Sequence, residues 1–265
     1  MTRDGLIGGL VAKAEADERV IALLLGGSLG AGRGDAFSDV DLILVVASAA
    51  HGAMVVEISD WIGLEVVHWM TPYPGLPLFC GVTPEWLRFD LTVTVPGRVL
   101  GAQNGLRPLV DRAGIWAALP PTLEPKPIAR EALEALVRET LRILGLLPVS
   151  IGREDYAVGV SGAGLLRGQL IALMVAMTEP AVPPGALHLA RILPAEDYIA
   201  LENLTPTAAS REGVIGASVE IAGLFIPRAK RLAKAVGLTW PTAMENAVRD
   251  HWRRSLGLDW PGDLC

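Results

Sequence analysis

The sequence is poor in cysteine and in lysine, and each shortage excludes a class of protein. Cys80 and Cys265 are the only cysteines, so the chain has neither a zinc-type ligand spacing nor a disulfide framework. Four lysines stand beside nineteen arginines, and the net charge is −6. Nonspecific affinity for nucleic acid comes largely from basic side chains that neutralise phosphates. We therefore expect a reduced protein that acts on a small molecule rather than on nucleic acid.

Long apolar runs are also missing. No uninterrupted apolar stretch approaches the roughly 18 residues that a membrane helix needs. The longest candidate, residues 157–177, is interrupted by Ser161, Arg167 and Gln169. The first ten residues contain Arg3 and Asp4 and do not follow the pattern of a cleavable signal. These features predict a cytoplasmic protein without a membrane partner, and they leave the oligomeric state open.

The chain is organised around residues 23–46, which read as a strand, a glycine turn, a polar loop and a second strand. Asp39 and Asp41 open the second strand. Because successive side chains on a strand alternate between faces, these two carboxylates share one face, roughly 6 to 7 Å apart. They repel each other unless a cation lies between them, and carboxylates are ligands that Mg²⁺ prefers. The pair therefore predicts a divalent metal site.

The glycine turn before this loop favours a phosphate ligand. Gly26 and Gly27 leave no side chain between the backbone and a ligand, so exposed N–H groups can meet phosphate oxygens. Ser28 adds a hydroxyl donor, and it also suits the N-cap of a helix. A phosphate-binding turn and a metal-binding pair together indicate nucleotidyl transfer.

This pattern resembles the signature of the polymerase-β-like nucleotidyltransferase superfamily: Gly27-Ser28, ten residues, then Asp39-Val40-Asp41-Leu42. Ser38 and the chain length are similar to those of bacterial nucleotidyltransferases that modify aminoglycosides or lincosamides. The resemblance covers residues 5–112 well and the remainder loosely. It implies an α/β (α+β) nucleotidyltransferase domain with a small mixed sheet, followed by an all-α helical bundle. It also implies transfer of AMP from an NTP to a small hydroxyl acceptor, with Mg²⁺ or Mn²⁺.

A third carboxylate is expected from the strand at residues 86–95. There Arg88, Asp90, Thr92 and Thr94 alternate with apolar residues, so Asp90 lies on the polar face. Superfamily members carry a carboxylate at a similar place, which implies a metal ligand or the base for the acceptor; an ordinary solvent-facing position is the alternative. The predicted catalytic and metal-binding residues are thus Asp39, Asp41 and Asp90. The predicted nucleotide-binding residues are Gly27, Ser28, Arg33 and Ser38, although Arg33 also fits a flexible surface arginine.

Residues 119–127 contain four prolines and predict a boundary between domains 1–119 and 120–265. Apolar periodicity predicts helices at 2–17 and 51–61 and strands at 20–25, 42–46, 63–69, 86–95 and 107–111. Beyond the boundary it predicts only helices, at 128–147, 155–177, 186–202, 208–236 and 242–256.

Several other residues have both a functional and a structural interpretation. Glu154 and Asp155 suit the start of a helix, where acidic groups complement the helix dipole. They also suit contact with the acceptor. The aromatic residues Trp69, Tyr73 and Trp86 suit core packing or an acceptor cleft. His68 suits a core position with a backbone partner, or a place beside the site. Two further functions stay open: adenylylation of a protein acceptor, and nucleotide binding without catalysis. Retention of Ser28 and the three aspartates argues against the second.

Overall fold

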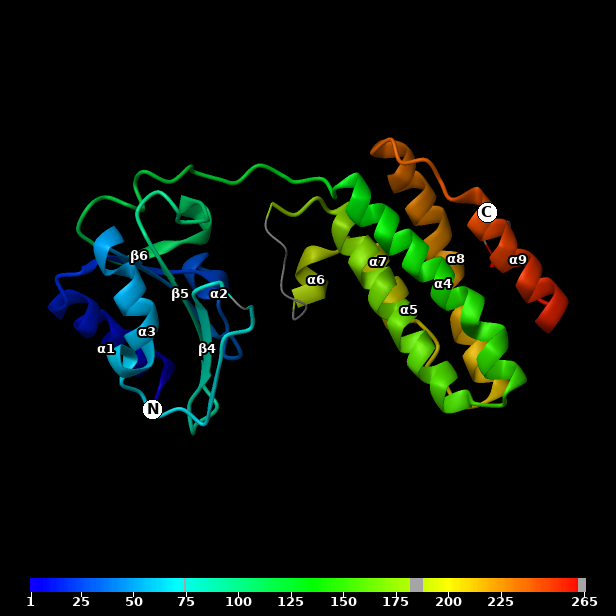
Figure 1. The fold of residues 1–265 in the computed structure, drawn as a ribbon, viewed down its shortest axis with the longest axis horizontal. Coiled ribbons are helices and arrows are strands. Elements are labelled where there is room, and N and C mark those ends of the chain that lie inside the picture. The colour runs from blue at the N-terminus through cyan, green and yellow to red at the C-terminus, as the bar shows by residue number, and fades with distance from the viewer. Residues whose placement is uncertain (74, 182–187, 262–265) are drawn as a thin grey trace. The chain divides into compact units, whose positions relative to one another are not determined.

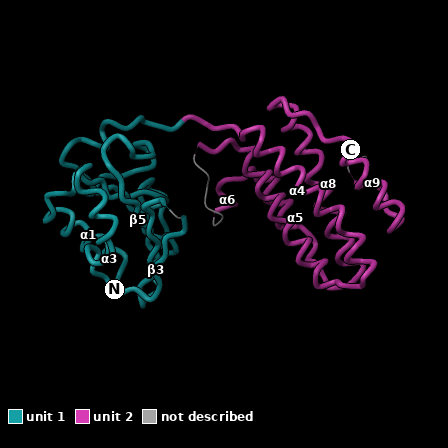
Figure 2. The backbone as a smooth tube through the Cα atoms, viewed as in Figure 1, with its two compact units in different colours: residues 1–123 teal, residues 124–265 magenta. Residues whose placement is uncertain are grey.

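The computed structural model describes residues 1–73, 75–181 and 188–261. The chain divides into two compact units, residues 1–123 and 124–265 (Figure 2). The division falls inside the proline-rich segment 119–127. Each unit has its own hydrophobic core.

Unit 1 is built on a mixed six-stranded sheet with the order β3-β4-β5-β2-β1-β6. The strands are β1 (Val20–Leu25), β2 (Val40–Val46), β3 (His68–Met70), β4 (Leu78–Val82), β5 (Arg88–Thr94) and β6 (Arg107–Asp111). The β2–β5 pair is parallel, and the other neighbouring pairs are antiparallel. This confirms the predicted α+β domain with a mixed sheet.

Two helices, α1 (Arg3–Ala16) and α3 (His51–Ile62), pack together in unit 1 (Figure 1). Their buried residues join the side chains of β1, β2 and β5 that face them in one core. Thr2 caps α1 by accepting a hydrogen bond from the Gly5 N–H, and Gly63 ends α3 in a left-handed conformation. Because Val40 and Leu42 belong to this core, Asp41 must point to the opposite face of the sheet.

One strand prediction in unit 1 was wrong, and one strand was missed. The strand predicted at 63–69 is reduced to β3, which lies at the edge of the sheet, and His68 is exposed rather than buried. Strand β4 was not predicted, because Pro77 and Gly81 interrupt its apolar pattern. A Cβ at Gly81 would lie 2.3 Å from the Phe89 ring, so the missing side chain makes room for that ring.

Unit 2 is helical, as predicted. It contains α4 (Arg130–Gly152), α5 (Tyr156–Met177), α6 (Leu189–Ile192), α7 (Ala195–Glu202), α8 (Arg211–Ala235) and α9 (Thr242–Leu256). The helix predicted at 186–202 is divided into α6 and α7 at Leu193 and Pro194; residues 186 and 187 lie outside the described residues. Helix α5 packs against both α4 and α8.

Helix α4 continues past its predicted end at residue 147, through Pro148. Proline has no N–H, so it cannot bond the carbonyl of Leu144 four residues earlier. The indole Nε1 of Trp252 donates to that carbonyl instead, at 2.7 Å. A residue of α9 therefore satisfies the group that the proline leaves open.

Within the described residues, α5 is the one helix with the length and apolar composition to cross a membrane, at a mean hydropathy of 1.5. Its buried residues include Leu166, Leu170 and Met174, which belong to the core of unit 2. A core helix of a helical bundle meets the same criterion, so composition alone does not establish a membrane span.

Candidate functional site

The two aspartates of the motif lie where β2 begins. Val40 and Leu42 are buried, and Asp41 between them is half-buried. Asp39 directly precedes the strand, so both carboxylates lie on the face opposite the α1–α3 core.

Strand β5 brings Asp90 to the same place. The parallel register pairs Asp41 with Asp90, and neighbouring strands lie roughly 4.8 Å apart. Along β5 the buried and half-buried residues alternate, as the sequence predicted, and Asp90 is on the half-buried face. The sheet therefore brings Asp41 and Asp90, which are 49 residues apart in the sequence, side by side.

The three carboxylates interact electrostatically. Burial, followed by the negative charges of Asp39 and Asp90, raises the pKa of Asp41 to about 6, and Arg88 acts in the opposite direction. A raised pKa of this kind means that ionising Asp41 costs additional free energy. A cation between the carboxylates would remove that cost.

Within residues 1–73, 75–181 and 188–261, no three His, Cys, Asp or Glu side chains converge closely enough to enclose a metal ion. Mg²⁺, however, commonly takes only one or two protein carboxylates and completes its shell with phosphate oxygens and water. The repulsion on Asp41 from Asp39 and Asp90 is the electrostatic environment that such an ion relieves. The donor set thus fits a magnesium–nucleotide complex better than a closed protein metal site.

The glycine turn lies directly against Asp41. The Gly26 N–H donates to the Asp41 carbonyl at 2.8 Å. Gly27 has φ +57°, and a Cβ at that position would lie 1.8 Å from Oδ2 of Asp41. Only glycine leaves this carboxylate in place, so the turn and the acidic strand form one structural unit.

The hydroxyls of Ser28 and Ser38 join the turn to the loop before β2. Ser28 Oγ donates to Ser38 Oγ at 2.8 Å, and Ser38 Oγ donates to Asp35 Oδ1 at 3.0 Å. Ser28 lies inside the short helix α2 (Gly27–Gly30), which has no side-chain cap, so the N-cap role expected of it was wrong. Arg33 is exposed, and its backbone N–H donates to the Ser28 carbonyl at 2.8 Å.

Two residues at the site were missed by the sequence analysis. Arg88 Nη2 lies 3.8 Å from Oδ2 of Asp39 and donates to the Phe37 carbonyl at 3.2 Å. Cys80 on β4 pairs in register with Asp90. Burial and a hydrogen bond to Asp90 raise the pKa of the Cys80 thiol to about 12, so it is protonated and donates to the carboxylate. The polar pattern of residues 88–94 was the available signal for Arg88.

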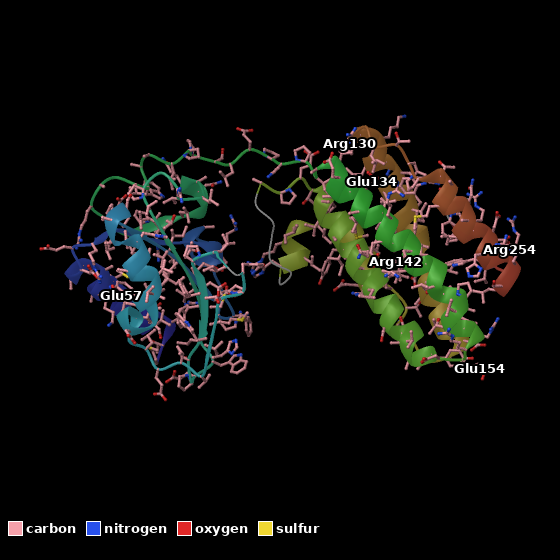
Figure 3. All side chains as sticks on the ribbon, in the orientation of Figure 1. Glu57, Arg130, Glu134, Arg142, Glu154 and Arg254 are labelled. Carbon is pink, nitrogen blue, oxygen red and sulfur yellow. The ribbon has the colours of Figure 1, made fainter. Side chains whose placement is uncertain are left out.

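The remaining candidates lie in other environments. Asp155 caps α5 by accepting from the Val158 N–H at 3.3 Å, which is the structural role expected of it. Glu154 lies at the turn between α4 and α5 (Figure 3). Trp69 stacks on Phe79 with ring centroids 5.6 Å apart. The other two aromatic candidates, Tyr73 and Trp86, are exposed rather than packed in the core.

Comparisons with known proteins add little to this geometry. No family model and no curated protein matches the chain. Among solved structures, the chain is similar to an aminoglycoside 6-adenyltransferase from Bacillus subtilis at 11% sequence identity and a TM-score of 0.43. The similarity covers 95% of this chain and 97% of that one. At this identity and score, no activity and no site residue is transferred from that enzyme.

Proposed function

We propose that the chain is a metal-dependent nucleotidyltransferase. It moves a nucleoside monophosphate, AMP, from an NTP to a hydroxyl group of a small acceptor such as an aminoglycoside-like antibiotic, and releases pyrophosphate. The observation that carries the proposal is the pairing of Asp41 with Asp90, beside a glycine turn that contacts the Asp41 carboxylate.

Each group at the site has a role in this reaction. Asp39 and Asp41 hold Mg²⁺ or Mn²⁺, which when bound neutralises the charge of the triphosphate. The backbone N–H at Gly27 and the hydroxyl of Ser28 bind phosphate oxygens. Arg33 and Ser38, on the loop that follows, belong to the same nucleotide-binding segment.

Asp90 serves the acceptor side. Its carboxylate takes the proton of the acceptor hydroxyl while the oxygen attacks the α-phosphorus. The new phosphorus–oxygen bond forms as the bond from that phosphorus to pyrophosphate breaks, and pyrophosphate leaves with the electron pair. Cys80 donates its S–H to Asp90 and so fixes the orientation of the base.

Turnover with labelled nucleotides tests the proposal. The purified chain is incubated with each of the four NTPs labelled at the α-phosphate, Mg²⁺ and a panel of aminoglycosides and lincosamides. We expect label on an acceptor together with one pyrophosphate per transfer, and ATP as the preferred donor.

The matched control is Asp41→Asn, which keeps the size of the side chain and removes its charge. This variant should transfer no label. Label that appears on the chain itself or on added protein, rather than on a small acceptor, would move the proposal to protein adenylylation. If no acceptor or protein is labelled and no pyrophosphate is released, the proposed activity is wrong.

A further inference from the structure

Arg88 stands at the start of β5, beside the acidic residues of unit 1, and the proposed reaction does not use it. It lies two residues before Asp90, so the two side chains share one face of the strand. Extending the parallel register of β2 and β5 by one residue places Asp39 beside Arg88, as Asp41 lies beside Asp90. One basic and three acidic side chains therefore form a group on one face of two neighbouring strands.

The guanidinium of Arg88 makes two different contacts. Its Nη2 donates to the Phe37 carbonyl at 3.2 Å, and the same atom lies 3.8 Å from Oδ2 of Asp39. The second distance is too long for a hydrogen bond, so the attraction to Asp39 is electrostatic. The side chains of Arg88 and Asp39 are 40% and 36% exposed, so solvent screens this attraction. The hydrogen bond to the backbone is therefore the stronger constraint.

The carbonyl that Arg88 binds belongs to the turn directly before Asp39. Ser28, in the glycine turn, holds the same segment from the other side, because its Oγ donates to Ser38 Oγ at 2.8 Å. Phe37 is two residues before Asp39, so their Cα atoms are at most about 7 Å apart. A shift of the Phe37 carbonyl therefore moves the backbone that carries the Asp39 carboxylate.

The charge of Arg88 has the opposite effect on a metal ion. Burial, Asp39 and Asp90 raise the pKa of Asp41, and Arg88 opposes them, so its charge already acts on this group of carboxylates. The same charge repels a divalent cation that these carboxylates bind. An exposed ion pair changes an equilibrium by about fivefold at most, whereas a hydrogen bond from a charged donor is worth roughly tenfold or more. We therefore expect the ordering effect of the hydrogen bond to exceed the repulsion.

We propose that Arg88 is a positioning residue of the metal site. Through the Phe37 carbonyl it holds the backbone that places Asp39 for Mg²⁺ or Mn²⁺. It acts through Asp39 and not on the reacting atoms. This role rests on the proposed function, which requires the metal, but metal binding is measured without turnover.

A Mn²⁺ titration of the full chain without nucleotide, followed by the electron paramagnetic resonance signal of the free ion, tests the proposal. Arg88→Met removes both the donor and the charge, and it should bind Mn²⁺ roughly fivefold more weakly than the parent chain. Arg88→Lys keeps a charged donor for the single carbonyl contact and should recover most of this loss. Arg98→Met changes an exposed arginine just after the end of β5, and this matched control should leave the affinity unchanged.

The direction of the change separates the two effects of Arg88. Tighter Mn²⁺ binding by Arg88→Met would mean that Arg88 acts only as a counter-charge, and this result would overturn the proposal. Unchanged affinity would overturn it as well. The Arg88 side chain is 40% exposed, so its substitution removes little packing, and a melting temperature close to that of the parent chain shows that the variant is folded.

The transfer of label from NTP is scored separately. If no acceptor is labelled but Arg88→Met still weakens Mn²⁺ binding, the proposed function is wrong and the role of Arg88 stands. If label is transferred and Arg88→Met binds Mn²⁺ as tightly as the parent chain, only the role of Arg88 is wrong.

Discussion

Gly27→Ala tests whether the glycine turn positions the acidic pair. Gly27 has φ +57°, and a left-handed conformation costs a residue with a Cβ about 1–2 kcal/mol. The added carbon would also lie 1.8 Å from Oδ2 of Asp41, whereas nonbonded heavy atoms keep roughly 3.5 Å apart. The carboxylate must therefore move by more than about 1 Å, and a misplacement of that size costs on the order of a hundredfold in rate.

The matched control is Gly32→Ala. Gly32 has φ +68°, and no atom lies within 4 Å of its Cβ position, so this variant has the backbone strain without the collision. Both variants should lose about 1–2 kcal/mol of unfolding free energy in urea. Only Gly27→Ala should lose kcat/KM for nucleotidyl transfer, by roughly a hundredfold beyond the control. Equal activity of the two folded variants would refute the positioning argument.

Three further outcomes are expected. Asp90→Asn should lower kcat by roughly a hundredfold and NTP affinity much less than Asp41→Asn does; an equal loss of NTP affinity in calorimetry would make Asp90 chiefly a metal ligand. ATP should bind only with Mg²⁺ or Mn²⁺, because Asp39 and Asp41 repel the triphosphate, and the same affinity in EDTA would contradict this. Asp17→Asn should lower unfolding free energy by about 2 kcal/mol at pH 7, because hydrogen bonds from Arg19 hold the pKa of Asp17 at about 2 instead of 3.8. This contribution is complete above pH 3.8 and disappears as pH falls towards 2, so urea unfolding should show a smaller deficit at pH 3, and an unchanged deficit would count against it.

Local patterns in the sequence were enough to predict much of the sheet. The bounds of β1 and β6 agree with the predicted residues 20–25 and 107–111, and the alternation along β5 places Asp90 on the polar face. A period of two is a property of a single strand, and it needs no knowledge of the neighbours.

Those local patterns do not predict which strands pair or in which register. No residue pattern within β2 or β5 indicates that the two strands are parallel, or that Asp41 lies opposite Asp90. For the same reason Arg88 and Cys80 were missed: each becomes part of the site through a residue on a neighbouring strand. The spacing of the acidic residues along each strand was readable in the sequence, whereas the residues that lie beside them on neighbouring strands depend on register.

The local effects of proline and glycine predict the wrong structure where a distant residue changes those effects. A proline inside a helix, such as Pro148, usually ends the helix because it leaves the carbonyl four residues earlier without a donor. In α4 that carbonyl, on Leu144, accepts from the indole of Trp252, 108 residues away, so the helix continues. Gly81 weakens a strand by its own propensity, yet a side chain there would collide with the Phe89 ring. In both cases tertiary packing outweighs the local penalty, which is about 3 kcal/mol for proline in a helix and about 0.5–1 kcal/mol for glycine in a strand. That packing is set by residues that no window along the sequence contains.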